Sequence, residues 1–246
     1  MALDLADYDR LARLGVAQFW EGRSSALEND EARGQGGERA GVLSGRNMDG
    51  FLAMVDALVR NNGLPDAKVC ISGRPNLTLP GYFRPTKLWD VLVLDGKKLV
   101  AAVELKSHVG PSFGNNFNNR AEEAIGTAQD LATAIREGVL GEQSPPFTGW
   151  LILVEECEKS QKSVRESSPH FPVFPEFQSA SYLTRYELLC RRLTLEGLYT
   201  QASVIASGRD ARTDGAYREL SMPTGLKTFA ARLAGHAAGW AASNAA

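Results

Sequence analysis

The chain contains few cysteines and histidines, three of each in 246 residues. Cys70, Cys157 and Cys190 are widely separated and show neither C-x-x-C nor Cys/His spacing. This pattern argues against both a disulfide framework and a zinc site, so we expect buried free thiols.

The sequence also lacks a long apolar run and a strong net charge. No segment approaches the roughly 20 apolar residues of a membrane span, and the acidic N-terminus does not resemble a signal peptide. The net charge of −2 argues against coating nucleic acid through bulk charge. We therefore expect a cytoplasmic protein with no membrane partner.

Length and composition favour one α/β domain over residues 1–246. A chain that is 43% hydrophobic can bury a full core. Two segments, 23–41 and 155–177, are rich in glycine, charge or proline and are expected to form flexible loops. Arg33 and Arg39 in the first loop are candidates for a clamp on nucleic acid, with a plain exposed linker as the alternative.

The segment WDVLVLDGKKLVAAVELKS, residues 89–107, carries the most specific pattern in the chain. Asp90, Glu104 and Lys106 have the spacing D-x13-E-x-K and accompany two apolar runs. The runs at 91–94 and 99–103 predict two antiparallel strands joined at an Asp-Gly turn.

The turn decides whether these three side chains can share a site. A two-residue turn at Asp95-Gly96 would leave Asp90 and Glu104 on opposite faces. A three-residue connection pairs Asp90 with Ala102 and sends all three side chains to one face. A shared site therefore requires the longer loop or a bulge.

Two carboxylates on one face suit magnesium, which prefers hard oxygen ligands and usually keeps several waters. Asp90 and Glu104 are the candidate ligands, together with the main-chain carbonyl of Leu105. Lys106 would hold its ammonium over the attacking water. The alternative is an ordinary solvent-exposed strand face, but a carboxylate at the end of an apolar strand is costly to bury unless it is paired or metal-bound.

The following segment is rich in asparagine, with four in the five residues 115–119. We expect a polar loop that leads into a helix over 120–137. Amide side chains suit adenine edges and an arginine suits guanine or phosphate, whereas a solvated loop with an Asn helix cap is the alternative. The candidate DNA-binding residues are Ser107, Asn115, Asn116, Asn118, Asn119 and Arg120.

Periodicity predicts the remaining elements. Helices are expected over 3–20, 47–61, 182–195 and 225–238, a central strand at 150–154 and an edge strand at 198–206. Asp49 and Asp56 on the second helix are candidates for an auxiliary acid of a nuclease site, with a solvated helix face as the alternative.

Three blocks resemble the XhoI-type restriction endonucleases: the motif above, GPSFGNNFNNRAEEAIGTA, and PHFPVFPEFQSASYLTRYELLCRRL. The resemblance implies a PD-(D/E)xK core, a mixed central sheet flanked by helices, with Asp90, Glu104 and Lys106 as catalytic triad. The sequence departs from the idealised motif at Trp89, where proline is usual.

The same resemblance implies a type II enzyme that acts on double-stranded DNA. It would use Mg2+ to cut within CTCGAG as a homodimer and leave 5′ overhangs, and a cognate DNA methyltransferase would protect the host DNA. The alternatives are another nuclease on the same core, which repairs or nicks DNA, and a non-catalytic DNA-binding module.

Overall fold

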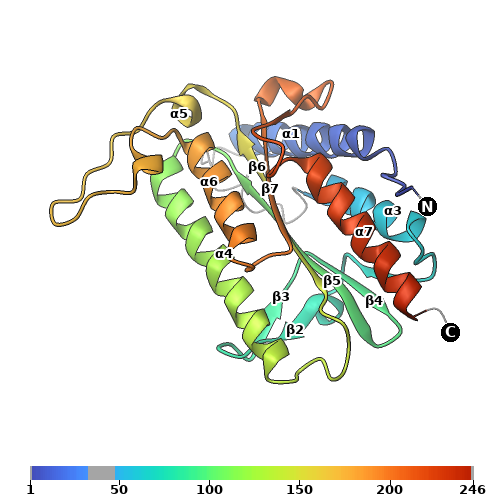
Figure 1. The fold of residues 1–246 in the computed structure, drawn as a ribbon. Helices are drawn as coiled ribbons and strands as arrows, with labels where there is room; N and C mark the ends of the chain where they lie inside the picture. Colours follow the sequence, from blue (N-terminus) through green and yellow to red (C-terminus); the bar gives the residue numbers. More distant parts are fainter. Residues whose placement is uncertain (1, 33–47, 245–246) are drawn as a thin grey trace.

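A six-stranded sheet forms the centre of the computed structural model, which describes residues 2–32 and 48–244 (Figure 1). The strand order is β1-β4-β5-β6-β7-β8. The strands are β1 (Lys68–Cys70), β4 (Val91–Asp95), β5 (Lys98–His108), β6 (Phe147–Glu155), β7 (Gln201–Ser207) and β8 (Arg218–Glu219). The predicted α/β class with a mixed sheet is confirmed.

The three central strands β5, β6 and β7 are parallel, whereas β1, β4 and β8 run antiparallel to their neighbours. Parallel strands need crossovers, which α4 (Phe113–Arg136) and α6 (Tyr182–Leu195) provide. The predicted strand at 150–154 is central, as expected. The edge position predicted for 198–206 is wrong, because β7 also pairs with the two-residue strand β8.

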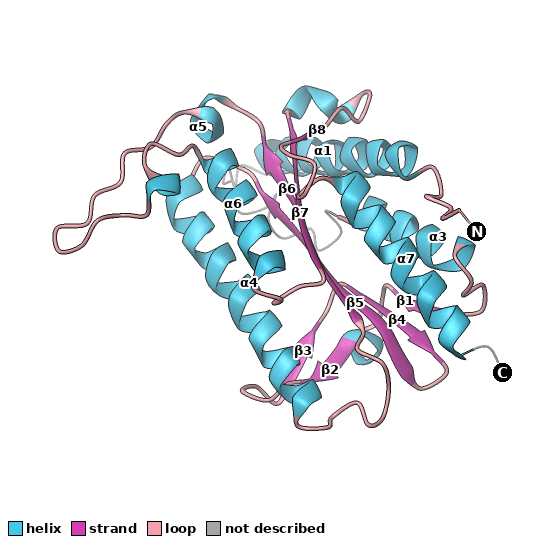
Figure 2. Ribbon diagram, in the orientation of Figure 1, coloured by secondary structure: helices cyan, strands magenta, loops and turns pink. Residues whose placement is uncertain are grey.

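Helices cover both faces of the sheet (Figure 2). On one face α1 (Tyr8–Ala32), α3 (Leu52–Asn61) and α7 (Leu226–Asn244) enclose a core with the buried side chains of Trp20, Phe51 and Phe229. On the other face α4 and α6 pack around Trp150 and Tyr186. Among the described residues no helix combines the length and apolarity that a membrane span needs.

Several predicted boundaries shift. The first helix starts at Tyr8 and continues to Ala32, so residues 23–32 are helical and not part of a loop. Good helix formers with no proline follow Gly22, which explains the extension. Arg33 and Arg39 lie outside the described residues. The last helix begins at Leu226, close to the prediction, and continues to Asn244.

The helix predicted over 182–195 is confirmed. The helix predicted over 47–61 begins later, because a 3-10 turn, η1 (Asp49–Phe51), precedes α3. The segment 155–177 begins within β6 and contains α5 (Glu158–Gln161) and η3 (Pro175–Phe177), leaving 162–174 as a protruding loop (Figure 1). Two further short turns are η2 (Arg74–Leu77) and η4 (Arg209–Arg212). All three cysteines are free thiols, as expected. Cys70 and Cys190 are buried, but the expected burial is wrong for Cys157, which is only partly buried.

A separate hairpin of β2 (Thr78–Pro80) and β3 (Thr86–Leu88) packs beneath the second half of α4. Its contacts form a small core with the buried residues Leu77, Leu79, Trp89 and Leu131. The sequence did not predict this hairpin, since three-residue strands carry no usable periodicity.

A bulge in β5 sets the register of the motif strands. Asp95 pairs with Lys98 and Leu94 with Leu99, but Val93 pairs with Ala101, so Val100 is the extra residue. The bulge required by the sequence argument is confirmed. The predicted partner of Asp90 is wrong, because the pairing of Val91 with Val103 places Asp90 opposite Glu104 and not opposite Ala102.

Candidate active site

Three side chains come together at the start of β4, where β5 extends past its pairing with β4: those of Asp90, Glu104 and Lys106. The Lys106 ammonium contacts Oε2 of Glu104 and lies 3.2 Å from Oδ2 of Asp90. The same Asp90 oxygen accepts a hydrogen bond of 2.8 Å from the Leu105 N–H. The three residues of the sequence motif therefore share one face and one set of contacts.

Leu105 presents its main chain to the same point. Its side chain is buried in the core. The N–H and C=O of one strand residue point to the same side, so the Leu105 carbonyl also faces the edge beside Asp90.

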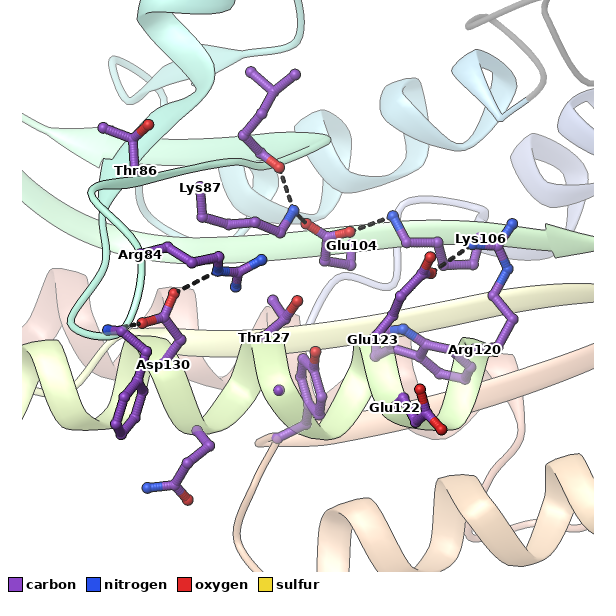
Figure 3. Close-up of a pocket in the computed structure, with 16 residues that line it drawn as sticks. Arg84, Thr86, Lys87, Glu104, Lys106, Arg120, Glu122, Glu123, Thr127 and Asp130 are labelled. Carbon is purple, nitrogen blue, oxygen red and sulfur yellow. Dashed lines mark hydrogen bonds and ion pairs between the residues drawn. The ribbon is translucent and has the colours of Figure 1, made fainter. Parts of the chain in front are cut away.

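Glu104 is the most deeply buried member of the site, with a side chain only 2% exposed. Its second oxygen, Oε1, contacts the ammonium of Lys87 on β3 (Figure 3). Lys87 Nζ also lies 5.3 Å from the centre of the Trp89 ring. Two lysines from different elements thus compensate the buried carboxylate.

Lys87 was missed by the sequence argument. It stands three residues before Asp90, and its contact with Glu104 exists only because the β2–β3 hairpin folds back along β5. Trp89, which replaces the proline of the idealised motif, is almost fully buried in the small core under this hairpin.

The charge of Lys106 follows from its surroundings. Burial by itself lowers the pKa of an ammonium. Here the carboxylates of Glu104 and Asp90 outweigh burial and raise the pKa of Lys106 above its ordinary value. Lys106 is therefore a hydrogen-bond donor and cation at neutral pH, not a base.

The residues present fit a magnesium ion. Among the described residues no three acidic, histidine or cysteine side chains are grouped so that they could hold a metal ion, so a cation here would have two carboxylates, a carbonyl and water as ligands. Asp90 and Glu104 already direct one oxygen each at a common cation, the Lys106 ammonium. The Asp90 side chain is 41% exposed, which leaves room for water and a phosphate.

A pocket of about 750 Å³ adjoins these residues, between the hairpin and α4 (Figure 3). Glu104 and Lys106 line it from β5, and Trp150 lines it from β6. Its other charged lining residues are Arg84, Lys87, Arg120, Glu122, Glu123 and Asp130. We call this pocket the catalytic cleft.

A second pocket, of about 320 Å³, continues beyond Arg120 and Glu123, which line both. Four of the candidate DNA-binding residues line it: Ser107, Asn116, Asn119 and Arg120. Asn115 and Asn118 are exposed on α4 and are not among its lining residues. The structure thus separates the asparagines into two groups.

The expected loop over 115–119 is wrong, because α4 begins at Phe113 and includes all four asparagines. Asparagine is a weak helix former. However, Phe113 and Phe117 are buried against α6 residues such as Tyr186, and this packing keeps the segment helical. Asn116, Asn119 and Glu123 then occupy one face at helical spacing.

Of the two candidate auxiliary acids, the structure describes only the side chain of Asp56. Asp49 begins the turn η1, and its side chain lies outside what the structure describes. Asp56 on α3 accepts a hydrogen bond of 2.8 Å from Arg60 Nε in a partly exposed ion pair. The solvated-face alternative therefore describes Asp56.

His108 occupies the same face of β5 two residues beyond Lys106. Its Nδ1 lies 2.6 Å from the Tyr186 hydroxyl, and its ring is tilted by 39° against the Phe113 ring with centroids 4.8 Å apart. Burial lowers the pKa of His108 to about 4, so the ring is neutral at pH 7. His108 thus joins β5, α6 and the start of α4 without carrying charge.

The central sheet is mixed, and it brings together an aspartate, a glutamate and the lysine of an E-x-K motif. This combination defines a nuclease of the restriction-endonuclease-like class. The comparisons agree. The chain matches the family model described as Restriction endonuclease XhoI over residues 28–219. No solved structure matches the chain.

Three relatives cover most of this chain. It is 84% identical to "Type II restriction enzyme XhoI" of Xanthomonas vasicola, over 80% of this chain and 79% of the relative. It is 55% identical to "Type II restriction enzyme AbrI" of Azospirillum brasilense, over 70% and 77%. Identity to "Type II restriction enzyme BstVI" of Geobacillus stearothermophilus is 45%, over 85% and 96%. The chain therefore belongs to the XhoI family of type II restriction endonucleases.

Proposed function

We propose that the protein makes magnesium-dependent double-strand cuts within the DNA palindrome CTCGAG and leaves 5′ overhangs. The chemistry is supported by one observation. The carboxylates of Asp90 and Glu104 both point at the Lys106 ammonium, beside the main chain of Leu105. The recognition sequence and the type of end come from the family resemblance.

In this proposal Asp90, Glu104 and the Leu105 carbonyl hold the metal. When bound, magnesium would neutralise charge on the phosphate and lower the pKa of water nearby. Glu104 is held in place by Lys87, so its free energy of reorganisation during the reaction is small. Lys106 would donate hydrogen bonds to the attacking water and the phosphate from its position beside both carboxylates.

DNA recognition is assigned to the start of α4. Asn116 and Asn119 lie beside Arg120 and Ser107 in the pocket that continues from the catalytic cleft. Amide side chains can bond adenine edges bidentately, and arginine can bond guanine. In this arrangement α4 would contact the bases, and β5, the strand before it, would hold the scissile phosphate.

We further propose that the enzyme works as a homodimer in the cytoplasm. A palindrome presents the same donors and acceptors on both strands, so a two-fold dimer reads each half with the same residues and places one site per strand. A cognate methyltransferase would have to protect CTCGAG in the host, since an unprotected genome would be cut.

The test is to incubate the protein with sequenced plasmid DNA, with and without magnesium, and to map the ends of the products. Magnesium-dependent double-strand ends confined to CTCGAG support the proposal. Nicks or random ends would reject the site and leave a different nuclease on the same core. Complete absence of cleavage, with specific binding retained, would point to a DNA-binding module.

A further inference from the structure

Two large aromatic side chains stand in solvent at the turn between β2 and β3. Tyr82 is 55% exposed and Phe83 67% exposed, and their rings meet edge to face with centroids 5.1 Å apart. We call residues 81–84, Gly-Tyr-Phe-Arg, the aromatic turn. Adjacent exposed aromatic rings are unusual on a surface that binds nothing.

The aromatic turn is held by a single buried carboxylate of α4. Asp130, 3% exposed, accepts hydrogen bonds from the N–H groups of Tyr82 and Phe83 at 2.8 and 2.7 Å, and from Arg84 Nε at 2.9 Å. Burial alone would raise the pKa of Asp130, but these three donors outweigh it and lower the pKa. The carboxylate is therefore charged and fully engaged.

Glycine is required at the start of the turn. A Cβ at Gly81 would lie 2.5 Å from Oδ2 of Asp130 and 2.7 Å from the Arg84 carbonyl oxygen. The backbone of the turn is thus fixed in detail, although its two aromatic side chains add little to the core. A rigid turn that exposes its largest side chains is preorganised for a partner, because little conformational entropy is lost on binding.

The place of the turn indicates which partner it meets. Phe83 and Arg84 line the catalytic cleft together with Glu104 and Lys106. In Figure 3 Arg84, Lys87, Glu104 and Lys106 follow one another along this cleft. A DNA strand that has its scissile phosphate at Glu104 and runs along this cleft passes the aromatic turn.

We infer that the aromatic turn inserts Tyr82 and Phe83 beside a base step of the DNA duplex bound in the catalytic cleft, next to the scissile phosphate, and partly unstacks that step, while Arg84 and Lys87 face the DNA backbone. The inference rests on the proposed function and adds a second contact region to it, opposite the asparagines of α4. The bases of a duplex already stack on one another, so this contact requires a base step to open and favours steps that unstack easily, without reading base edges.

The test compares the wild type with Tyr82→Ala, Phe83→Ala and the double variant in steady-state cleavage of a CTCGAG duplex. Loss of stacking on one base corresponds to about 5- to 160-fold in affinity, and opening the duplex step takes back part of this, so we expect KM for the double variant to rise about fivefold to tenfold. Phe83→Trp should keep the wild-type KM. Met222→Ala, which removes an 81% exposed apolar side chain outside the cleft, is the matched control.

Direct contact is checked by photocrosslinking to duplexes with 5-iodouracil at thymine positions in and beside CTCGAG. We expect crosslinks at Tyr82 or Phe83 in the wild type and their loss in the double variant. An unchanged KM together with no crosslink at these residues would overturn the inference. So would a double variant whose defect is loss of self-association at unchanged DNA affinity.

Cleavage by the wild type distinguishes failure of the proposed function from failure of the aromatic contact. If the wild type does not cut CTCGAG, the proposed function fails. If the wild type cuts and the double variant matches Met222→Ala, only the stacking contact fails.

Discussion

The side chain of Asp90 takes the place of a strand at the edge of β5. Its Oδ2 accepts the Leu105 N–H at 2.8 Å, beyond the last pairing of β4 with β5 at Val91 and Val103. The free edge of β5 is thereby capped by a carboxylate beside Glu104. Backbone pairing and the candidate metal site depend on the same oxygen.

Glu104→Gln should abolish cleavage and keep specific DNA binding. The amide retains the size of the side chain but loses the charge that would hold a cation, so we expect a fall in the cleavage rate of about a thousandfold or more. Single-turnover cleavage and gel-shift binding measure the two effects. Asp95→Asn, at the other end of β4, is the control and should cut normally. Normal cutting by a verified Glu104→Gln protein would remove the central assignment.

Lys87→Met should slow cleavage while the protein stays folded. The ammonium of Lys87 holds Oε1 of Glu104, and small displacements of a catalytic group cost about tenfold to 100-fold in rate. Single-turnover rates at saturating DNA give the effect, and thermal unfolding reports the fold. Lys97→Met, in the exposed turn after β4, is the matched control. Equal rates for both variants would show that Lys87 does not position Glu104.

Alanine at Asn116 and Asn119 should relax specificity. One mismatched base pair costs about 1 to 3 kcal/mol in a specific complex, so loss of these contacts should reduce discrimination against single-base variants of CTCGAG by roughly ten- to 100-fold. Competition binding with variant duplexes measures this. Asn115→Ala and Asn118→Ala change residues that do not line this pocket and should behave like the wild type. Equal discrimination by all four variants would contradict the assignment.

His108 makes the stability depend on pH. Its pKa is lowered to about 4 in the folded protein, below the ordinary histidine value, so its contribution is complete above about pH 6.5 and is lost as the pH falls toward 4. The loss amounts to at most about 3 kcal/mol in the free energy of unfolding. Burial also lowers the pKa of His236, which adds to the same window.

The effect of His108 is measured by urea unfolding of the wild type and His108→Gln between pH 7 and pH 4.5. His108→Gln should lose less stability on acidification than the wild type. Tyr186→Phe keeps the imidazole buried and should retain the wild-type pH dependence. An identical slope for His108→Gln and the wild type would show that another group is responsible.

Much of the site could be predicted from the sequence because its parts are close in the chain. Asp90, Glu104 and Lys106 lie on two consecutive strands, and the argument about side-chain faces led to the bulge that the structure contains. The helix at 182–195 and the central strand around Trp150 followed from periodicity.

What could not be predicted depends on packing between distant segments. Lys87 reaches Glu104 through a hairpin of three-residue strands. The asparagines of α4 became helical because Phe113 and Phe117 are buried against α6, which overrides their weak intrinsic preference.

The sequence by itself determined the class of fold and the three residues at the centre of the site, since these depend on local apolar patterns and a short spacing, and it indicated the family through the resemblance of three sequence blocks. Only the tertiary structure decided that Lys87 shares Glu104, that Asn116 and Asn119 but not their neighbours face the second pocket, and that Asp130 fixes the aromatic turn. These contacts join residues separated by up to 48 positions. Such pairs form when burial of several cores brings their elements together, and no local pattern encodes that outcome.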